Sequence, residues 1–96
     1  MHAMIQRYVG TAPTTDDVVA AGRRLSGMLD RAPGFVSCVI LRAGPGRLTM
    51  VSLFEDEASL EAAGLLLDGA GLGHHLNAPV EPTEVTTGEV VFQKGL

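Results

Sequence analysis

Between Arg47 and Phe54 the order of apolar and polar residues predicts a strand. Leu48 and Phe54 fall on one parity of this strand, whereas Val51 and Leu53 fall on the other. A strand with one face in water alternates between apolar and polar side chains, because successive side chains point to opposite faces. Here both parities are apolar, so we expect both faces of the strand to be covered in the folded protein.

The spacing of Val18, Leu25 and Leu29 predicts an amphipathic helix before this strand, with Thr14 as its N-cap. The glycines and proline of Ala43–Gly46 are typical of a turn and predict a hairpin. We expect the following elements: strands over Met4–Val9, Phe35–Arg42, Arg47–Phe54 and Thr86–Lys94, a helix from Thr14 to the stop at Pro33-Gly34, and a second helix that opens at Glu55-Asp56.

The predicted order is β-α-β-β-α-β, which is the order of ferredoxin-like α+β domains. In that fold a four-stranded antiparallel sheet has both helices on one face, so the helices leave the second apolar face uncovered. Soluble monomers rarely expose an apolar patch of that size. We therefore expect a homodimer, in which two sheets pack face to face and the closing strands cross over to form a two-chain barrel.

Length and composition limit the classes of function. A chain of 96 residues has room for one core, so we expect a single domain over residues 1–96. The net charge of -4 and the scattered basic residues argue against a nucleic-acid partner. One cysteine forms no internal disulfide, the N-terminus lacks a signal-peptide pattern, and no apolar run approaches the ~20 residues that span a bilayer. We expect a cytoplasmic protein without a membrane partner.

Several short segments support a family resemblance: the first strand M-I-Q-R-Y-V, the bend A-P-G-F, the segment V-S-L-F-E-D-E-A-S-L-E-A and the pattern G-E-V-V-F. In their order and spacing they resemble the dimeric α+β barrel superfamily and, within it, the antibiotic-biosynthesis-monooxygenase-like (ABM-like) group. Its members include cofactor-free oxygenases of aromatic polyketides or quinols, haem-degrading enzymes and stress-associated proteins. The resemblance implies a ligand-sized cleft between the sheet and the helices of each subunit.

Enzymes of this group are associated with an Asn on the first strand, a Trp on the second helix and a His further along. This chain has no Asn on its first strand and no Trp at all, so only His74 and His75 match. The predicted catalytic residues are His74, His75 and Tyr8, acting as a general base or as hydrogen-bond donors to a ligand. The alternative for the two histidines is a solvated last helical turn, and for Tyr8 a place in the lining of the barrel.

The residues expected to line the cleft are five apolar ones: Phe35, Met50, Phe54, Ala63 and Leu67. Packing alone also explains Met50 and Phe54. We predict no metal site, because the spacing of the histidines and Cys38 matches no recognised ligand set.

The sequence predicts a dimer that binds a hydrophobic, aromatic small molecule and acts as a cofactor-free monooxygenase or isomerase. The first alternative is a non-catalytic binding module, and the second is a haem protein with a histidine as axial ligand. The glycine-rich segment 69–73 is expected to be either a lid over the cleft or a break in the helix.

Overall fold

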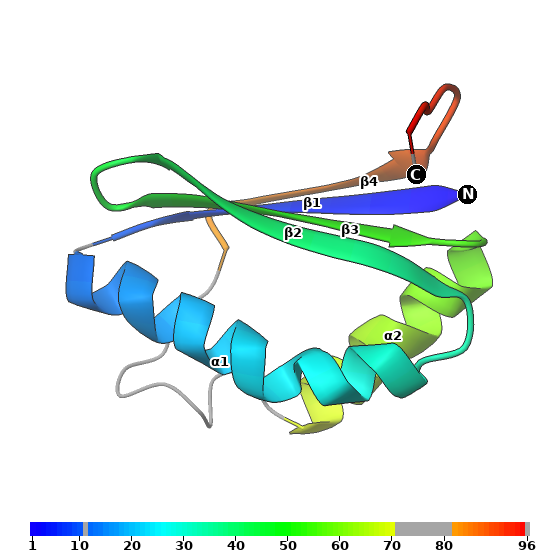
Figure 1. The fold of residues 1–96 in the computed structure, drawn as a ribbon, viewed down its shortest axis with the longest axis horizontal. Coiled ribbons are helices and arrows are strands. Elements are labelled where there is room, and N and C mark those ends of the chain that lie inside the picture. Colours follow the sequence, from blue (N-terminus) through cyan, green and yellow to red (C-terminus); the bar gives the residue numbers. More distant parts are fainter. Residues whose placement is uncertain (11, 71–81, 96) are drawn as a thin grey trace.

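A computed structural model describes residues 1–10, 12–70 and 82–95. Its elements are β1 (His2–Val9), α1 (Ala12–Arg31), β2 (Phe35–Gly44), β3 (Arg47–Phe54), α2 (Glu57–Ala70) and β4 (Glu84–Glu89). Within those residues four strands form one antiparallel sheet in the order β2-β3-β1-β4. Both helices lie against the same face of the sheet, and no described element covers the other face (Figure 1). The predicted ferredoxin-like α+β fold is confirmed.

The register of the strands decides which side chains share a face. Residues directly opposite one another in an antiparallel pair point to the same side of the sheet. Tyr8 lies opposite Leu48, and both side chains are only 2% exposed beneath the helices. Val51 lies opposite both Ile5 and Val39, and this row points to the face without helices. The prediction that β3 is apolar on both faces is therefore confirmed, with Phe54 on the helix side.

Two clusters of buried side chains attach the helices to the sheet. The first consists of Tyr8, Val18 and Leu48, with Val19 and Ile40 packed against it. The second consists of Ala32, Phe54, Leu60 and Ala63, with Met4, Leu29 and Phe35 packed against it. The rings of Phe35 and Phe54 meet edge to face, with their centroids 5.8 Å apart. Because the first cluster uses the early turns of α1 and the second uses its end, the two clusters hold opposite ends of that helix.

α1 begins at Ala12, so Thr14 lies in the first turn and its prediction as N-cap is wrong. Pro13 also falls in the first turn, where a proline is tolerated because that N–H has no partner within the helix. The helix ends at Arg31, close to the predicted Pro33-Gly34 stop. Neither α1 nor the described length of α2 is long and apolar enough to cross a membrane.

α2 begins at Glu57, one to two residues after the predicted opening. Asp56 precedes the helix and caps it, since its Oδ1 accepts a hydrogen bond from the backbone N–H of Ser59 at 2.8 Å. Hydrogen bonds from the Ser59 hydroxyl and, to a smaller extent, its backbone N–H lower the pKa of the Asp56 carboxyl. Glu55 still belongs to the preceding turn, where its N–H donates to the carbonyl of Gly34 at 2.7 Å.

The predicted hairpin between β2 and β3 is present, and β2 continues to Gly44 rather than ending at Arg42. Gly46 has a φ of +69°, in the left-handed region that favours glycine. A Cβ at this position would collide with the carbonyl oxygen of Gly10. The same approach lets the N–H of Gly10 donate to the carbonyl of Gly46 at 2.8 Å, which ties the end of β1 to the turn.

β4 covers Glu84–Glu89, so the predicted closing strand over Thr86–Lys94 is placed too late in the chain. β4 pairs with β1 from Arg7–Glu84 to His2–Glu89, and a last hydrogen bond joins the Val90 N–H to the carbonyl of Met1 at 2.9 Å. The chain then leaves the sheet, and Phe92 is 81% exposed.

Candidate functional site

A cavity of about 880 Å³ lies between the sheet and α1. This volume is within the range of small-molecule sites, ~300–1,000 Å³. The lining residues are Met4, Gln6, Tyr8, Val18, Val19, Gly22, Arg23, Ser26, Leu29, Asp30, Phe35, Ser37, Cys38, Ile40, Met50, Ser52 and Gly64. The sheet-side wall is mainly apolar and contains a few hydrogen-bonding groups, while the exposed polar residues belong to α1.

The sheet contributes its wall through the alternation of side chains along β1. Met4, Gln6 and Tyr8 all line the cavity, because every second residue of a strand points to the same face. The register places Ser52 of β3 opposite Met4, and Met50 opposite Gln6. One strand further out, Cys38 of β2 lies opposite Ser52, whose hydroxyl lies 3.8 Å from the Cys38 Sγ. The polar side chains of Gln6 and Ser52 therefore lie among the apolar side chains of Met4 and Met50 in the cavity wall.

Tyr8 is the most unusual residue of the cavity wall. Its side chain is 2% exposed, and its buried hydroxyl has no hydrogen-bond partner among the described residues. Burying a hydroxyl without a partner costs roughly 1–3 kcal/mol by protein mutational data. Burial also raises the pKa of the Tyr8 phenol above its ordinary value, so the group stays protonated at neutral pH. A protonated phenol favours hydrogen-bond donation over proton abstraction, so Tyr8 suits the donor role better than that of a base.

The opposite wall is formed by α1, which approaches β2 closely at Gly22. A Cβ on Gly22 would lie 2.9 Å from the Cδ1 of Ile40, so the absence of a side chain permits this contact. On the described part of α2, Gly64 is the residue that reaches the cavity, because Leu60 and Ala63 pack directly against Phe54. Among the described side chains, the cavity is therefore bounded by the sheet and α1, with Gly64 of α2 at its edge.

The structure brings some of the predicted site residues together. Tyr8, Met50 and Phe35 line the cavity. Phe54 and Ala63 lie in the adjacent buried cluster and do not reach the cavity wall. The side chain of Leu67, both residues His74 and His75, and residues 71–73 of the glycine-rich segment are outside the described part of the chain, so their roles stay predictions.

Sequence reasoning missed several lining residues, among them Gln6, Arg23 and Asp30. A signal for Gln6 was present, since it shares its parity with Tyr8 on the first strand. Arg23 gave no comparable signal, because it reads as part of the solvated side of an amphipathic helix. Its place at the cavity depends on how α1 is rotated against the sheet. Residues 1–10, 12–70 and 82–95 contain no group of three or more metal-binding side chains.

Comparison with known proteins supports the fold. No protein-family profile matches the sequence, and no curated protein matches it either. The solved structures that share the architecture include SnoaB, a cofactor-independent oxygenase from Streptomyces nogalater. Its TM-score is 0.73 at 17% sequence identity, over 96% of this chain and 93% of SnoaB.

Two further solved structures widen the range of activities on this fold. The haem degrader MhuD from Mycobacterium tuberculosis, solved with two haems in its active site, has a TM-score of 0.75 at 20% identity, over 99% of this chain and 100% of its own. An antibiotic biosynthesis monooxygenase has a TM-score of 0.71 at 18% identity, over 95% of this chain and 99% of its own. The predicted ABM-like architecture is confirmed, while identities this low leave the activity to be argued from the site.

Haem is the cofactor that the sequence allowed as an alternative, with a histidine as axial ligand. The cavity volume suits a group of that size, but none of its described lining residues is a histidine. Burial keeps the Tyr8 phenol protonated, which disfavours an axial phenolate. The described residues therefore do not fit a histidine-ligated haem.

Proposed function

We propose that this protein binds a hydrophobic, aromatic small molecule in the cavity between α1 and the sheet and acts on it as a cofactor-free monooxygenase. The observation that supports this proposal is Tyr8, which lines the largely apolar cavity and whose buried hydroxyl has no partner among the described residues. An oxygen atom of a bound ligand would satisfy that donor. SnoaB, which shares this fold, is a cofactor-independent oxygenase.

The chemistry assigned to the described residues is charge stabilisation and exclusion of water. A cofactor-free oxygenase removes a proton from its substrate, and the resulting anion reduces dioxygen directly. The Tyr8 hydroxyl would donate a hydrogen bond to the substrate oxygen on which that negative charge develops. Apolar side chains such as Met4, Met50 and Phe35 keep water away and strengthen this interaction. The base that accepts the proton remains the predicted His74 or His75.

Replacement of Tyr8 by Phe tests this proposal. Tyr8→Phe keeps the ring and removes the unpartnered hydroxyl, so we expect the free energy of unfolding to stay within about 1 kcal/mol of the wild type or to rise. Oxygen uptake with a panel of anthrones and quinols should fall by roughly 100-fold in the variant, the scale of losing one oxyanion donor. The measurements are thermal unfolding and oxygen consumption.

Other outcomes separate the alternatives. Binding of panel compounds without oxygen uptake by the wild type would identify a non-catalytic binding module. A Soret band gained with hemin, and lost in His74→Ala or His75→Ala, would identify a haem protein. Tyr8→Phe with undiminished turnover would contradict the donor role.

The active assembly is a homodimer in which the face opposite the helices packs against a second copy. That face presents Ile5, Val39, Leu41, Val51 and Leu53, with Val39 54% and Leu41 44% exposed. Arg7 and Glu84 lie on the same face and form an ion pair at 3.3 Å, so the charges at its margin neutralise each other within one chain. An apolar surface of this kind marks an interaction site.

The segment after β4 extends the same surface. Val91 and Phe92 are 90% and 81% exposed, and Figure 1 shows this segment rising from the end of β4 on the side away from the helices. Side chains of this size gain roughly 1.5–3 kcal/mol each from full burial. In the dimer the segment after β4 would therefore pack on the partner, which is the crossing of closing strands expected from the sequence.

A further inference from the structure

One row of α1 side chains, apolar at its start and polar in its other three members, borders the cavity. Val19, Arg23, Ser26 and Asp30 follow one another at intervals of four, three and four residues, and all four line the cavity. Residues at this spacing lie on one face of a helix. Arg23, Ser26 and Asp30 are exposed, so they form a polar rim above the apolar cavity wall.

Arg23 differs from two other arginines of the chain in its surroundings. Arg7 pairs with Glu84 at 3.3 Å and Arg42 pairs with Asp16 at 3.0 Å. Within the described residues, no carboxylate lies within ion-pair distance of the Arg23 guanidinium. An arginine at the edge of a cavity that is unpaired in this way is available to a ligand.

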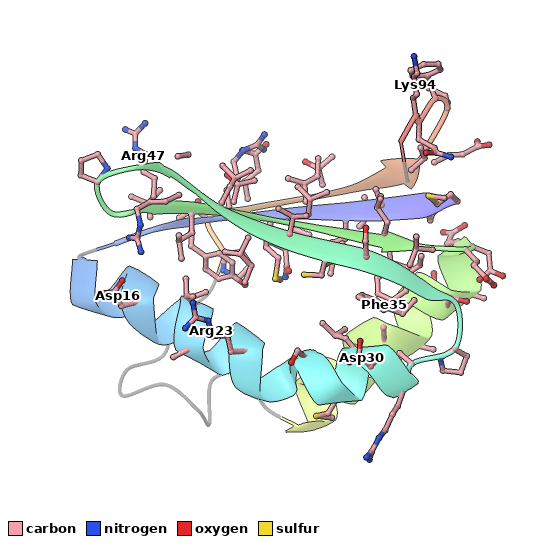
Figure 2. All side chains as sticks on the ribbon, in the orientation of Figure 1. Asp16, Arg23, Asp30, Phe35, Arg47 and Lys94 are labelled. Carbon is pink, nitrogen blue, oxygen red and sulfur yellow. The ribbon has the colours of Figure 1, made fainter. Side chains whose placement is uncertain are left out.

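The rim has opposite charges at its two ends. Arg23 and Asp30 are seven residues apart, which corresponds to about 10 Å along a helix axis. Figure 2 shows the two residues at separate places along α1, with Phe35 on the strand beside Asp30. Val19, one turn before Arg23, packs on the Tyr8 cluster, whereas Leu29 packs on the Phe54 cluster. Arg23 therefore lies nearer the Tyr8 cluster, and Asp30 and Phe35 lie nearer the Phe54 cluster at the other end of the cavity.

We propose that Arg23 selects ligands that combine an apolar, aromatic body with a carboxylate, and that the carboxylate binds the Arg23 guanidinium at the cavity mouth. The body of the ligand then lies along Met4, Met50 and Phe35, and Asp30 repels the reverse orientation. Guanidinium and carboxylate groups match in a bidentate geometry, which gives direction as well as affinity. This inference rests on the proposed binding function of the same cavity and adds the charge of the ligand.

Three naphthalene probes of equal size test the inference by calorimetric titration: 2-naphthoate, its methyl ester and 2-naphthylmethylammonium. Hydrogen bonds between charged groups are stronger than those to a neutral ester. We therefore expect the wild type to bind the carboxylate about tenfold or more tightly than the ester, and the ammonium most weakly. The preference should decrease with added salt, because the rim is exposed to solvent.

Arg23→Gln should remove the preference for the carboxylate and leave the affinity for the ester within about twofold of the wild type. Arg31→Gln is the matched control, since Arg31 is exposed in the last turn of the same helix and does not line the cavity. This control should keep the full preference. Asp30→Asn should strengthen binding of the carboxylate slightly.

The outcomes separate this inference from the proposed function. Equal affinity of the wild type for carboxylate and ester would overturn the role of Arg23 and leave the binding function intact. The same conclusion follows if Arg23→Gln weakens both probes equally, or if Arg31→Gln abolishes the preference. Failure of the wild type to bind any of the probes would overturn the inference together with the binding function.

Discussion

The two faces of the sheet are built from the same strands and have different surroundings. On the helix side, Tyr8, Leu48 and Phe54 are at most 2% exposed beneath α1 and α2. On the other side, Val39 and Leu41 are 54% and 44% exposed, although the residues are equally apolar. Both faces satisfy the same hydrophobic pattern, and only one is covered by the described residues of the chain (Figure 2). Hydrophobicity along a strand thus shows that a face will be covered, but not by which molecule.

The covered face also differs in function. α1 is held at both ends by buried clusters, and the cavity between α1 and the sheet is lined by Tyr8, whose hydroxyl has no partner among the described residues. The open face, which lies opposite the helices, presents a broad aliphatic surface. We propose that the first face binds the ligand and that the second associates with another copy of the chain. The predictions below separate these two roles.

The largest effect is expected from two phenylalanines that differ in burial. Phe54→Ala removes a ring that is 1% exposed and should lower the free energy of unfolding by about 3–5 kcal/mol. Phe92→Ala removes the same atoms from a side chain that is 81% exposed, and should change the stability of the monomer by less than about 0.5 kcal/mol. Urea unfolding at low protein concentration measures both. Equal losses would show that burial does not separate the two regions.

The next effect concerns the open face itself. Val39→Lys places an ammonium on the proposed contact surface, twice per dimer, and should weaken dimerisation by about 100-fold or more. In sedimentation, the Val39→Lys variant should have the mass of one 10.0 kDa chain, whereas the wild type should have the mass of a dimer, ~20 kDa. Ala58→Lys, on the exposed side of α2, is the matched control and should remain dimeric. A wild type that stays monomeric at micromolar concentration would rule out the proposed assembly.

The smallest effect concerns the cap that starts α2 on the covered face. Hydrogen bonds from Ser59 lower the pKa of the folded Asp56 carboxyl, so its contribution to stability is present above the unfolded pKa and disappears as the pH falls through the folded pKa. We expect a small drop of Tm below about pH 4 in the wild type. Asp56→Asn keeps an acceptor without a charge, and should show a smaller drop in that range. Identical pH profiles would contradict the role of the charge.

The sequence predicted the layers and order of the fold from hydrophobic spacing and turn residues. The strand at Arg47–Phe54 is confirmed with its bounds, and the other elements are confirmed with shifted ends. The errors have local causes. Thr14 is typical of a helix cap, but α1 begins at Ala12 and includes Pro13 in its first turn. The apolar run at 90–92 predicts a strand, but the pairing of β4 with β1 covers Glu84–Glu89.

The candidate site was less accessible to sequence reasoning. Tyr8 could be placed on one face of β1 by parity, but its buried and unpartnered hydroxyl depends on the neighbours that α1 and β3 supply. Arg23 could not be assigned to the cavity, because the rotation of α1 about its axis decides which polar residues reach the rim. Parity within a strand is a local property, whereas burial and proximity depend on residues distant in the sequence.

By itself, the sequence determined the order of the elements and the apolar character of both sheet faces, since the spacing of apolar residues is a property of neighbouring positions. Only the tertiary structure decided that the cavity lies under α1 and that Arg23 lies nearer the Tyr8 cluster. These features arise where α1 packs across the sheet at Gly22, and such packing depends on the shapes of all contacting side chains together.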